Sequence, residues 1–510
     1  MKILFIYPNA GSQLGFNYGL AHMSAVLKQA GHEVKLLHLA EELAPLPDEA
    51  QLRNLVSAYD PGIIGFSVVT NQWHLAEQTA AWIRKQISVP MVCGGIHATV
   101  APEQVLGSGL FDYVLAGECD TAFLELVDTI AKGGDPSGIR NLGFLKDGAV
   151  HLNPVRPFPD LASLPMKDYT IFDFQKLIDE KNGWVGLMAS RGCPFQCTYC
   201  FNHIIVKKYR ADLDCGFSKL NYIRHFPVSA MIAEIRYLLE HYTGINMFIF
   251  DDDLFTFDAD YLAEFCAEYR KICRIPFVVN AHVHFFDPRR ARSLADAGCR
   301  IVKFGLESGS PRVRKEIMRR HTSNKDIAAA IQYAKDEGMH TSCFVMIGLP
   351  GETAENVMET IRLLAEAKPG RFRWTFFYPY PGTEAYAISE RGGYIDFDKK
   401  ESLVNFTDAT CLDFGPEQNL FLQKVGRVMP WFVNAWSDLD CADVYRQKVD
   451  ELLALDETSW KAVGDTLTAE DKRLSQEMVQ SGKTHYAIKY NRFMGVISDY
   501  FLGEEKQPRP

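Results

Sequence analysis

Residues 190–202 read SRGCPFQCTYCFN and place Cys193, Cys197 and Cys200 within eight positions of one another. Three thiolates on one compact loop can ligate three irons of a [4Fe–4S] cubane and leave the fourth iron open. An open iron is what a small molecule carrying an amino and a carboxylate group chelates. The alternatives are a zinc site or three unrelated cysteines. Structural zinc prefers paired Cys-x2–4-Cys knuckles, and no second knuckle follows.

Around this loop, strand-like and helix-like patterns alternate. Six such units within residues 184–385 predict an open, partial (β/α)6 TIM-like barrel, since a full eight-unit barrel typically needs ~250 residues. The active site of such a fold lies at the carboxyl ends of the strands, which is where the cysteine loop falls. The six strand candidates are Val185–Ser190, Met247–Phe250, Phe277–Asn280, Ile301–Leu306, His340–Ile347 and Phe372–Tyr378.

Upstream, a second alternation predicts a doubly wound, Rossmann- or flavodoxin-like α/β domain over residues 1–135. A ligand of such a sheet sits at the carboxyl ends of its strands. Small and polar residues occupy those ends and allow a large flat ligand to approach: Pro8-Asn9, Thr70-Asn71, Gly94–His97 and Gly117-Glu118. The strand candidates are residues 2–8, Glu33–Leu39, Gly62–Val69, Val89–Gly94 and Phe111–Ala116, with a helix over Tyr18–Ala30.

The rest of the chain lacks this alternation. Residues 136–183 are rich in Pro, Gly and Asp, which predicts a linker with one hairpin around Leu142–Leu152. Residues 386–510 predict a small, mostly helical C-terminal domain, with helices over Leu420–Asn434, Ala442–Leu455 and Asp471–Leu502.

Composition restricts the class of protein. A net charge of −10 disfavours a nucleic-acid partner, which usually needs a basic face. The first residues do not have the pattern of a signal peptide, and no apolar run reaches the ~18 residues of a membrane span. The twelve cysteines do not form the pattern of a disulfide framework. We therefore expect a cytoplasmic protein.

Cys-x3-Cys-x2-Cys after the first strand of a βα series resembles the radical S-adenosylmethionine (SAM) superfamily, and the resemblance covers residues 185–385. It implies that the cysteines hold a [4Fe–4S] cluster, that SAM binds the fourth iron, and that one electron cleaves SAM to a 5′-deoxyadenosyl radical. It also implies SAM contacts from Tyr199 near the adenine, from Glu307 and Ser308 in Gly305–Ser310, from Gly348 in Gly348–Thr353, and from Tyr380 in Tyr378–Thr383.

Asp251-Asp252-Asp253 follows the second strand, where the superfamily often has Gly-Gly-Glu to grip the amino group of SAM. We assign Asp252 or Asp253 to that role. The alternative is that one of these aspartates caps the next helix.

The N-terminal domain resembles the cobalamin-binding domain of cobalamin-dependent radical SAM enzymes over about residues 1–130. The motifs are Gly94-Gly95-x-His97-Ala98-Thr99-x2-Pro102-Glu103 and Asp112-Tyr113-Val114-x2-Gly117-Glu118. The resemblance implies cobalamin contacts from Asn9, Ser67, Thr70, Gly94, Gly95, His97, Gly117 and Glu118. The chain lacks Asp-x-His-x2-Gly, so no histidine is expected on the lower face of cobalt. His97 equally suits helix entry, and Ser67 and Thr70 equally suit bonding to the backbone.

Three further stretches have competing interpretations. His282 and His284 point to one face of a strand end and suit a metal or substrate role, but no third ligand is evident. The aromatic run Phe372–Tyr380 suits a substrate pocket, although such runs are more often core. Met318–His321 (MRRH) is most simply a solvated helix end.

The two resemblances together predict a cobalamin-dependent radical SAM methyltransferase that methylates an unactivated carbon through methylcobalamin. The cofactors carry the chemistry, so no catalytic residue is assigned. A rival keeps the cofactors without methyl transfer, as in the anaerobic cyclase that builds the fifth ring of chlorophyll-type pigments. Another rival is a cobalamin or SAM sensor without turnover. A methylthiotransferase is disfavoured, because the N-terminal domain lacks three clustered cysteines. The expected partners are a small-molecule, lipid or natural-product substrate and an external electron donor such as flavodoxin or ferredoxin.

Overall fold

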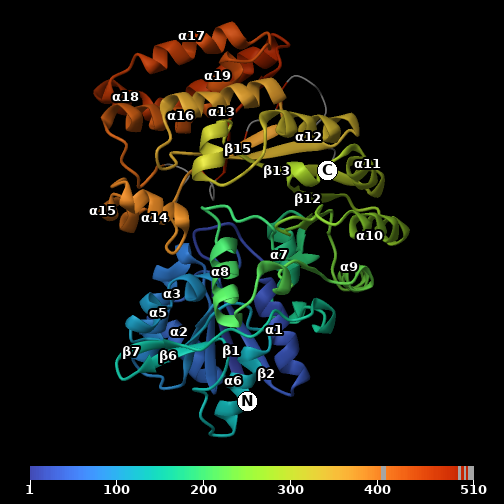
Figure 1. Ribbon diagram of the computed structural model, residues 1–510, viewed down its shortest axis with the longest axis vertical. Helices are drawn as coiled ribbons and strands as arrows, with labels where there is room; N and C mark the ends of the chain where they lie inside the picture. Colours follow the sequence, from blue (N-terminus) through green and yellow to red (C-terminus); the bar gives the residue numbers. More distant parts are fainter. Residues whose placement is uncertain (404–408, 492–494, 499–500, 503–510) are drawn as a thin grey trace. The chain divides into compact units, whose positions relative to one another are not determined.

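The computed structural model describes residues 1–403, 409–491, 495–498 and 501–502 (Figure 1). The chain divides into two compact units. The first unit comprises Met1–Gln196, Cys200–Phe248 and Pro381–Thr383. The second comprises Cys197–Tyr199, Ile249–Tyr380 and Glu384–Pro510.

The first unit is built on a seven-stranded sheet with the order β2-β1-β3-β4-β5-β6-β7. Its parallel strands are β1 (Lys2–Pro8), β2 (Glu33–Leu39), β3 (Ile63–Ser67), β4 (Met91–Gly94) and β5 (Tyr113–Leu115). Strand order reverses at β1, which pairs with β2 on one side and β3 on the other, so this sheet is doubly wound as predicted. Strands β6 (Leu142–Lys146) and β7 (Ala149–Leu152) form the predicted hairpin and extend the sheet in the antiparallel sense.

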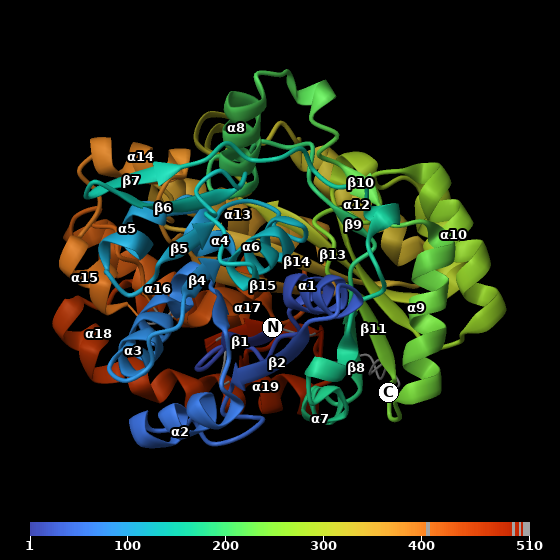
Figure 2. The same cartoon turned by 90° about the horizontal axis from the view of Figure 1, so that it is seen from below.

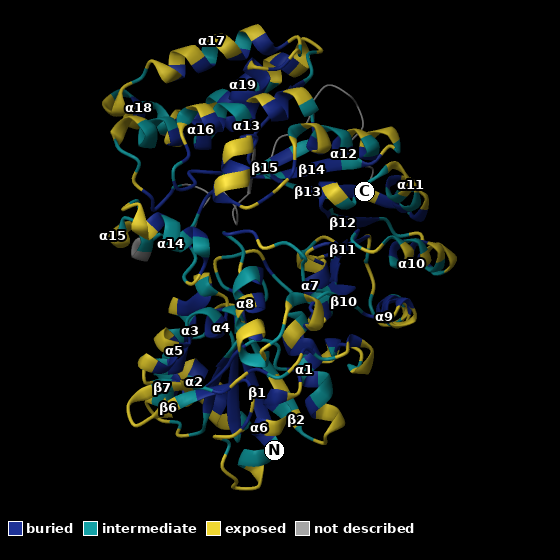
Figure 3. Cartoon of the chain, viewed as in Figure 1, coloured by how far each residue is buried: buried dark blue, intermediate teal, exposed yellow. Residues whose placement is uncertain are grey.

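Helices cover both faces of this sheet (Figures 1 and 2). Helix α1 (Tyr18–Gln29) packs with α6 (Ala122–Ala131), and α2 (Glu49–Tyr59) packs with α3 (Trp73–Arg84). The short helices α4 (Ile96–Val100) and α5 (Pro102–Gly107) follow β4. Because both faces are covered, the central strands are buried along most of their length, as Figure 3 shows.

The rest of the first unit contains the segments that flank the cysteine loop. Strand β9 (Ser190–Arg191) leads into the loop and pairs with β10 (Arg224–His225), and α8 (Asn202–Leu213) follows the loop. The remaining elements are α7 (Phe174–Glu180), β8 (Trp184–Leu187) and α9 (Val228–His241). The predicted linker contributes a buried cation here, because Lys167 Nζ lies 2.8 Å from the Glu234 carboxylate and both side chains are buried.

The second unit contains a parallel ladder of β12 (Phe277–Ala281), β13 (Cys299–Glu307), β14 (His340–Ile347) and β15 (Arg371–Phe376). The full sheet has the order β15-β14-β13-β12-β11-β8, and the division into units falls within β11 (Met247–Phe250). All six predicted strands are present. The intervening helices are α10 (Ala259–Ile272), α11 (Pro288–Ala297), α12 (Asn324–Asp336) and α13 (Ala354–Ala367). Phe372, Trp374 and Phe376 of the aromatic run are buried, which confirms the core interpretation for β15.

The C-terminal region is mostly helical, as predicted. Its helices are α14 (Glu384–Arg391), α15 (Phe397–Ser402), α16 (Pro416–Ala435), α17 (Ala442–Leu453), α18 (Glu457–Val463) and α19 (Leu467–Gln480). The predicted helix over Asp471–Leu502 is wrong beyond Gln480. There the described residues form short strands: β16 (His485–Tyr486), β17 (Lys489–Asn491), β18 (Gly495–Ser498) and β19 (Phe501–Leu502). The stretch is rich in β-branched and aromatic residues, which favour strands.

Candidate cofactor sites

The cysteine loop connects β9 to α8. Cys197 is buried, Cys193 and Cys200 are partly exposed, and none of the three is in a disulfide. Among the described residues, no three His, Cys, Asp or Glu side chains already stand together as metal ligands. The fit to a cluster therefore rests on the donor chemistry: one short loop carries three thiols outside any disulfide, and one of them lies beside a buried N–H donor.

That donor is Arg320, which the sequence assigned to a solvated helix end. This interpretation is wrong for Met318 and Arg320, which are buried, whereas Arg319 and His321 are exposed. Arg320 Nη1 lies 3.8 Å from Cys197 Sγ and 3.3 Å from Tyr199 Oη. Its Nη2 donates to the Gly305 carbonyl at 2.7 Å. The tyrosine predicted near adenine and the thiol of Cys197 thus share one guanidinium.

Glu307 ends β13 in the left-handed region, with φ 66°. The ladder to β14 shifts register between Gly305 and Glu307, so this carboxylate is displaced from the regular alternation of the strand. A Cβ on Gly305 would lie 2.4 Å from Glu307 Oε1 and 3.3 Å from Arg320 Nη2, so a larger residue here would displace the Glu307 carboxylate. Burial raises the pKa of Glu307, while Arg320 and a hydrogen bond with Tyr199 oppose the rise.

Ser308 follows Glu307 and is fully buried. Its Oγ lies 3.4 Å from the Thr360 hydroxyl and accepts the Ser310 N–H at 3.2 Å. The hydroxyl therefore serves the turn between β13 and the following segment.

Gly348 begins the loop after β14 with φ 76°. Its N–H donates to Glu352 Oε2 at 2.6 Å, and the Leu349 N–H donates to the same oxygen at 3.2 Å. Glu352 is buried, and burial raises its pKa to about 8. The sequence analysis quoted this glutamate only as part of a motif. Its position four residues after Gly348, the glycine that follows the strand, is the sequence signal that could have identified it.

The aspartates after β11 differ in exposure: Asp252 is fully buried, whereas Asp251 and Asp253 are exposed. The Asp252 carbonyl accepts a hydrogen bond from Asn280 Nδ2 at 2.9 Å. The expectation that one of the three caps the next helix is wrong, because Asp258 caps α10 and accepts the Asp260 and Tyr261 N–H groups.

Aromatic packing defines the surroundings of two other predicted sites, Tyr380 and the pair His282 and His284. Tyr380 packs edge-on against Tyr378 with ring centroids 5.0 Å apart, and burial raises its pKa to about 12. The His282 and His284 rings lie 5.2 Å apart. Burial, with help from Arg320 and His284, lowers the pKa of His282 to about 2, so its imidazole is neutral.

The loop after β1 is organised by Asn9. Its Nδ2 donates to the Ser12 hydroxyl at 2.9 Å, and its Oδ1 accepts the Gly15 N–H at 2.9 Å. Ser67, at the end of β3, accepts a hydrogen bond from Asn17 Nδ2 at 3.0 Å, and Asn17 caps α1. Both predicted cobalamin residues therefore lie at the carboxyl ends of neighbouring strands and stiffen the loops there.

The β4 end carries Gly94, Gly95 and His97. Gly95 has φ 90°, and a Cβ there would lie 2.6 Å from the Val68 carbonyl oxygen, whereas a Cβ on Gly94 would meet only Phe66 O, at 3.7 Å. His97 is buried and stacks on Trp73, with centroids 4.7 Å apart. Its Nδ1 lies 3.4 Å from Thr70 Oγ1, and burial lowers its pKa to about 4.

Gly117 and Glu118 follow β5. A Cβ on Gly117 would lie 2.5 Å from Tyr209 Oη, and the Glu118 N–H donates to that hydroxyl at 2.9 Å. The Glu118 carboxylate accepts from Arg191 Nη1 at 2.7 Å and from Arg224. Its side chain is therefore committed to two arginines within the first unit.

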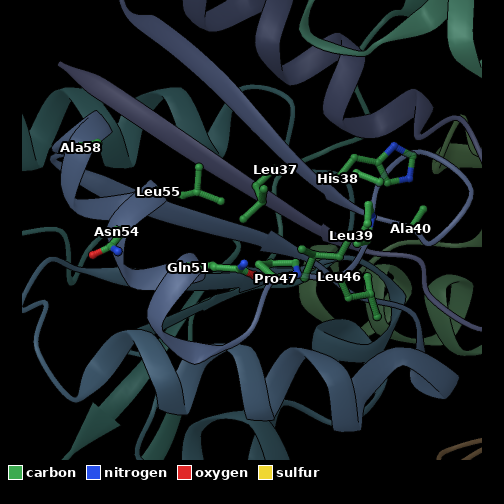
Figure 4. A pocket seen from close by; sticks show the side chains of 12 residues that line it. Leu37, His38, Leu39, Ala40, Leu46, Pro47, Gln51, Asn54, Leu55 and Ala58 are labelled. Atoms are coloured by element: carbon green, nitrogen blue, oxygen red, sulfur yellow. The ribbon is translucent and has the colours of Figure 1, made fainter.

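A separate apolar groove of about 600 Å³ lies between β2 and α2 in the first unit (Figure 4). None of the predicted cobalamin residues lines it. The lining residues are Leu37, His38, Leu39, Ala40, Ala44, Pro45, Leu46, Pro47, Gln51, Asn54, Leu55 and Ala58.

The doubly wound sheet and the cysteine-bearing βα module correspond to two known sequence families. The B12 binding domain matches residues 12–127, and the Radical SAM superfamily matches residues 187–364. An uncharacterized methyltransferase, PH0819, of Pyrococcus horikoshii is 30% identical over 405 residues, covering 76% of this chain and 83% of that protein. The chain belongs to the cobalamin-dependent radical SAM enzymes, whose cofactors are a [4Fe–4S] cluster, SAM and cobalamin.

Other relatives and solved structures agree with this assignment. The anaerobic magnesium-protoporphyrin IX monomethyl ester cyclase of Rubrivivax gelatinosus is 24% identical, covering 81% of this chain and 75% of the cyclase. The cytidylyl-2-hydroxyethylphosphonate methyltransferase of Streptomyces wedmorensis is 23% identical, covering 80% and 84%. The fold is shared with TsrM of Kitasatospora setae bound to cobalamin and a [4Fe-4S] cluster (TM-score 0.63, 18% identity, 76% of this chain and 75% of TsrM). It is also shared with OxsB bound to aqua-cobalamin and SAM (TM-score 0.67, 14% identity, 94% and 78%). None of the described helices has the length and apolar character that a membrane span requires.

Proposed function

We propose that this enzyme is a C-methyltransferase that uses SAM twice: once as methyl donor to cobalamin and once as the source of the radical that activates an unreactive carbon. The observation that carries the proposal is the pairing of both domains in one chain with a 30% identical relative described as a methyltransferase. The substrate is proposed to be a small molecule, and an external one-electron donor such as flavodoxin or ferredoxin supplies the electron. The proposed location is the cytoplasm, where thiols stay reduced.

We also propose which residues hold the three cofactors. Cys193, Cys197 and Cys200 hold the cluster, and Tyr199, Glu307, Gly348 and Tyr380 contact SAM. Ser308 and either Asp252 or Asp253 complete that set. Cobalamin lies on the carboxyl ends of β1, β3, β4 and β5, where the strand-end glycines allow its close approach. The protein positions these groups and excludes water, and the cofactors supply the chemistry when bound.

The test uses SAM with a deuterated methyl group and needs no substrate. The protein is reconstituted anaerobically with iron, sulfide and cobalamin, and cobalt and iron are quantified per chain. After reduction, a methyltransferase moves the labelled methyl group from sulfur to cobalt, leaving S-adenosylhomocysteine. We expect labelled methylcobalamin and S-adenosylhomocysteine in equal amounts by mass spectrometry.

The cyclase relative gives the rival its support, because a cyclase uses the same domains without methyl transfer. 5′-Deoxyadenosine without any S-adenosylhomocysteine or labelled cobalamin would favour that rival. Cofactor binding with neither product would point to a sensor. Absence of bound cobalt would contradict methyl transfer through cobalamin altogether.

A further inference from the structure

Arg320 is a buried cation whose donors converge on the cysteine loop. Its side chain, in a residue that is 8% exposed, reaches Cys197, Tyr199 and the Gly305 carbonyl. A charge held away from water is costly unless opposite charges or dipoles compensate it. The acidic or potentially anionic groups that act on it are Tyr199, Glu307 and Cys197.

The position of Cys197 relative to Arg320 is fixed by the neighbouring backbone. The Thr198 N–H donates to the Met318 carbonyl at 3.2 Å, and the Thr198 hydroxyl donates to the Ile317 carbonyl at 2.5 Å. The segment that carries Arg320 is itself tied back, because the Arg320 N–H donates to the Arg314 carbonyl at 2.7 Å. Two short segments, far apart in sequence, therefore hold the guanidinium against the thiol.

The adjacent arginine provides a contrast within the same turn. The Arg319 side chain is 55% exposed and forms an ion pair with Glu384 at 2.5 Å. It has the same charge and the same chemistry as Arg320, but it points to solvent. An exposed ion pair contributes little to local electrostatics, whereas a buried charge–thiolate contact is weakly screened.

We propose that Arg320 sets the reduction potential of the cluster by donating a charged N–H···S hydrogen bond to the Cys197 thiolate. A [4Fe–4S] cluster held by Cys193, Cys197 and Cys200, as proposed above, would gain one negative charge on reduction, and part of that charge would fall on the cysteine sulfurs. A fixed cation hydrogen-bonded to one of those sulfurs stabilises the reduced state and raises the potential. No bond forms or breaks at Arg320, so it is a positioning and electrostatic residue rather than a catalytic one.

The experiment is a redox titration of the reconstituted full-length protein in the absence of SAM, followed by electron paramagnetic resonance. The variants are Arg320→Gln, which removes the charge, and Arg320→Lys, which keeps the charge but loses the planar fork. Arg319→Gln is the matched control. Iron and sulfide are counted in each protein. We expect a more negative midpoint potential in Arg320→Gln, a smaller shift in Arg320→Lys, and the wild-type potential in Arg319→Gln.

Leaving SAM out separates this role from a contact with the cofactor. If Arg320 acted only on SAM, its replacement would weaken SAM binding and leave the SAM-free potential unchanged, and that result would overturn the proposal. Failure of both Arg320 variants to take up iron would also overturn it, because the arginine would then be needed only to form the loop. The readout requires the cluster but not methyl transfer, so a failed methyl-transfer assay leaves it intact.

Discussion

At the scale of single residues, two neighbouring cations near the predicted SAM site differ in burial. Arg319 and Arg320 are adjacent and chemically identical, yet one is solvated and the other is buried beside a cysteine. The difference comes from the Arg319 backbone, which has φ 54° and so turns successive side chains in different directions. No sequence pattern encodes such a turn for a pair of arginines. The cysteines were identifiable because their spacing is itself the signal.

Cys197→Ala tests the assignment of the cluster ligands. Two remaining thiolates cannot hold a cubane firmly, so we expect iron and sulfide after anaerobic reconstitution to fall to a small fraction of wild type. The matched control is Cys215→Ala, which removes a partly exposed cysteine outside the loop. Equal iron content in the Cys197 variant and wild type would contradict the assignment.

Glu352 predicts a specific pH dependence of stability. Its pKa is raised from 4.5 to about 8 in the folded chain, so the folded state keeps a proton that the unfolded state releases over that range. The unfolded state then binds fewer protons, and the free energy of unfolding falls as pH rises from 4.5 to about 8. Glu352→Gln cannot ionise. We expect the thermal midpoint of this variant minus that of the wild type to increase as the pH rises from about 5 to about 9.

The control for this measurement is Glu355→Gln in α13. Glu355 is exposed, and its pKa is lowered by Arg362, so it is ionised in both states throughout that pH range. Its difference from wild type should stay constant. A constant difference for Glu352→Gln as well would show that the buried carboxylate is ionised at all these pH values.

At the scale of elements, the strands were predictable and the C-terminal end was not. β1, β11 and β14 begin and end where the apolar runs predicted, because strands covered on both faces require continuous apolar sequence. The short strands after Gln480 follow no such rule. Among the described residues, β17 and β18 form a two-stranded sheet. Each strand is too short for its sequence to show the alternation that predicts a strand.

The end of β4 distinguishes a glycine needed by the fold from one available to a ligand. Gly95 has positive φ and no room for a Cβ, whereas Gly94 has neither constraint. We expect Gly95→Ala to lower the thermal midpoint of the cobalamin-free protein. Gly94→Leu should leave that midpoint close to wild type but weaken cobalamin binding by about tenfold or more, roughly 1.4 kcal/mol.

Cobalamin binding to these variants is measured by absorption titration of the reconstituted protein. Gly107→Ala, in α5, is the control, since a Cβ there meets nothing within 4 Å. Undiminished binding by Gly94→Leu would move the cobalamin site away from the end of β4.

At the scale of the whole chain, residues far apart in sequence share buried ion pairs within the first unit. Arg191 precedes Cys193 by two positions and pairs with Glu118 at 2.7 Å and with Asp120 at 2.9 Å. Although burial opposes it, Arg191 holds the pKa of Asp120 below its usual range. Arg224 completes the set by pairing with Glu118. The loop after β5 and the strand that enters the cysteine loop are thus joined through the carboxylates of Glu118 and Asp120.

Sequence reasoning placed Glu118 at a strand end and predicted a cobalamin contact for it. It did not predict the ion pairs with Arg191 and Arg224, because motifs report position and not partners. The same limit applies to Lys167, which lies in the Pro-rich segment read as a linker and is buried against Glu234. Pairings across 67 or more positions depend on tertiary structure, and a single sequence contains no direct record of them.

The network predicts a large cost for removing its central carboxylate. Glu118→Gln leaves Arg191 and Arg224 without their shared counter-charge, and breaking a largely buried pair costs about 3–5 kcal/mol of unfolding free energy, less here because Glu118 is partly exposed. Glu125→Gln breaks an exposed pair with Arg156 and should cost less than ~1 kcal/mol. Denaturant unfolding of both variants measures the contrast.

A double-mutant cycle with Arg191→Met isolates the coupling between Arg191 and Glu118, which we expect to exceed ~1 kcal/mol. Equal losses of unfolding free energy in Glu118→Gln and Glu125→Gln would show that the pairs around Glu118 stabilise the fold no more than an exposed pair does. If instead Glu118→Gln lost both cobalt and iron on reconstitution while Glu125→Gln lost neither, the network would be what aligns the cobalamin loop with the strand that leads to Cys193.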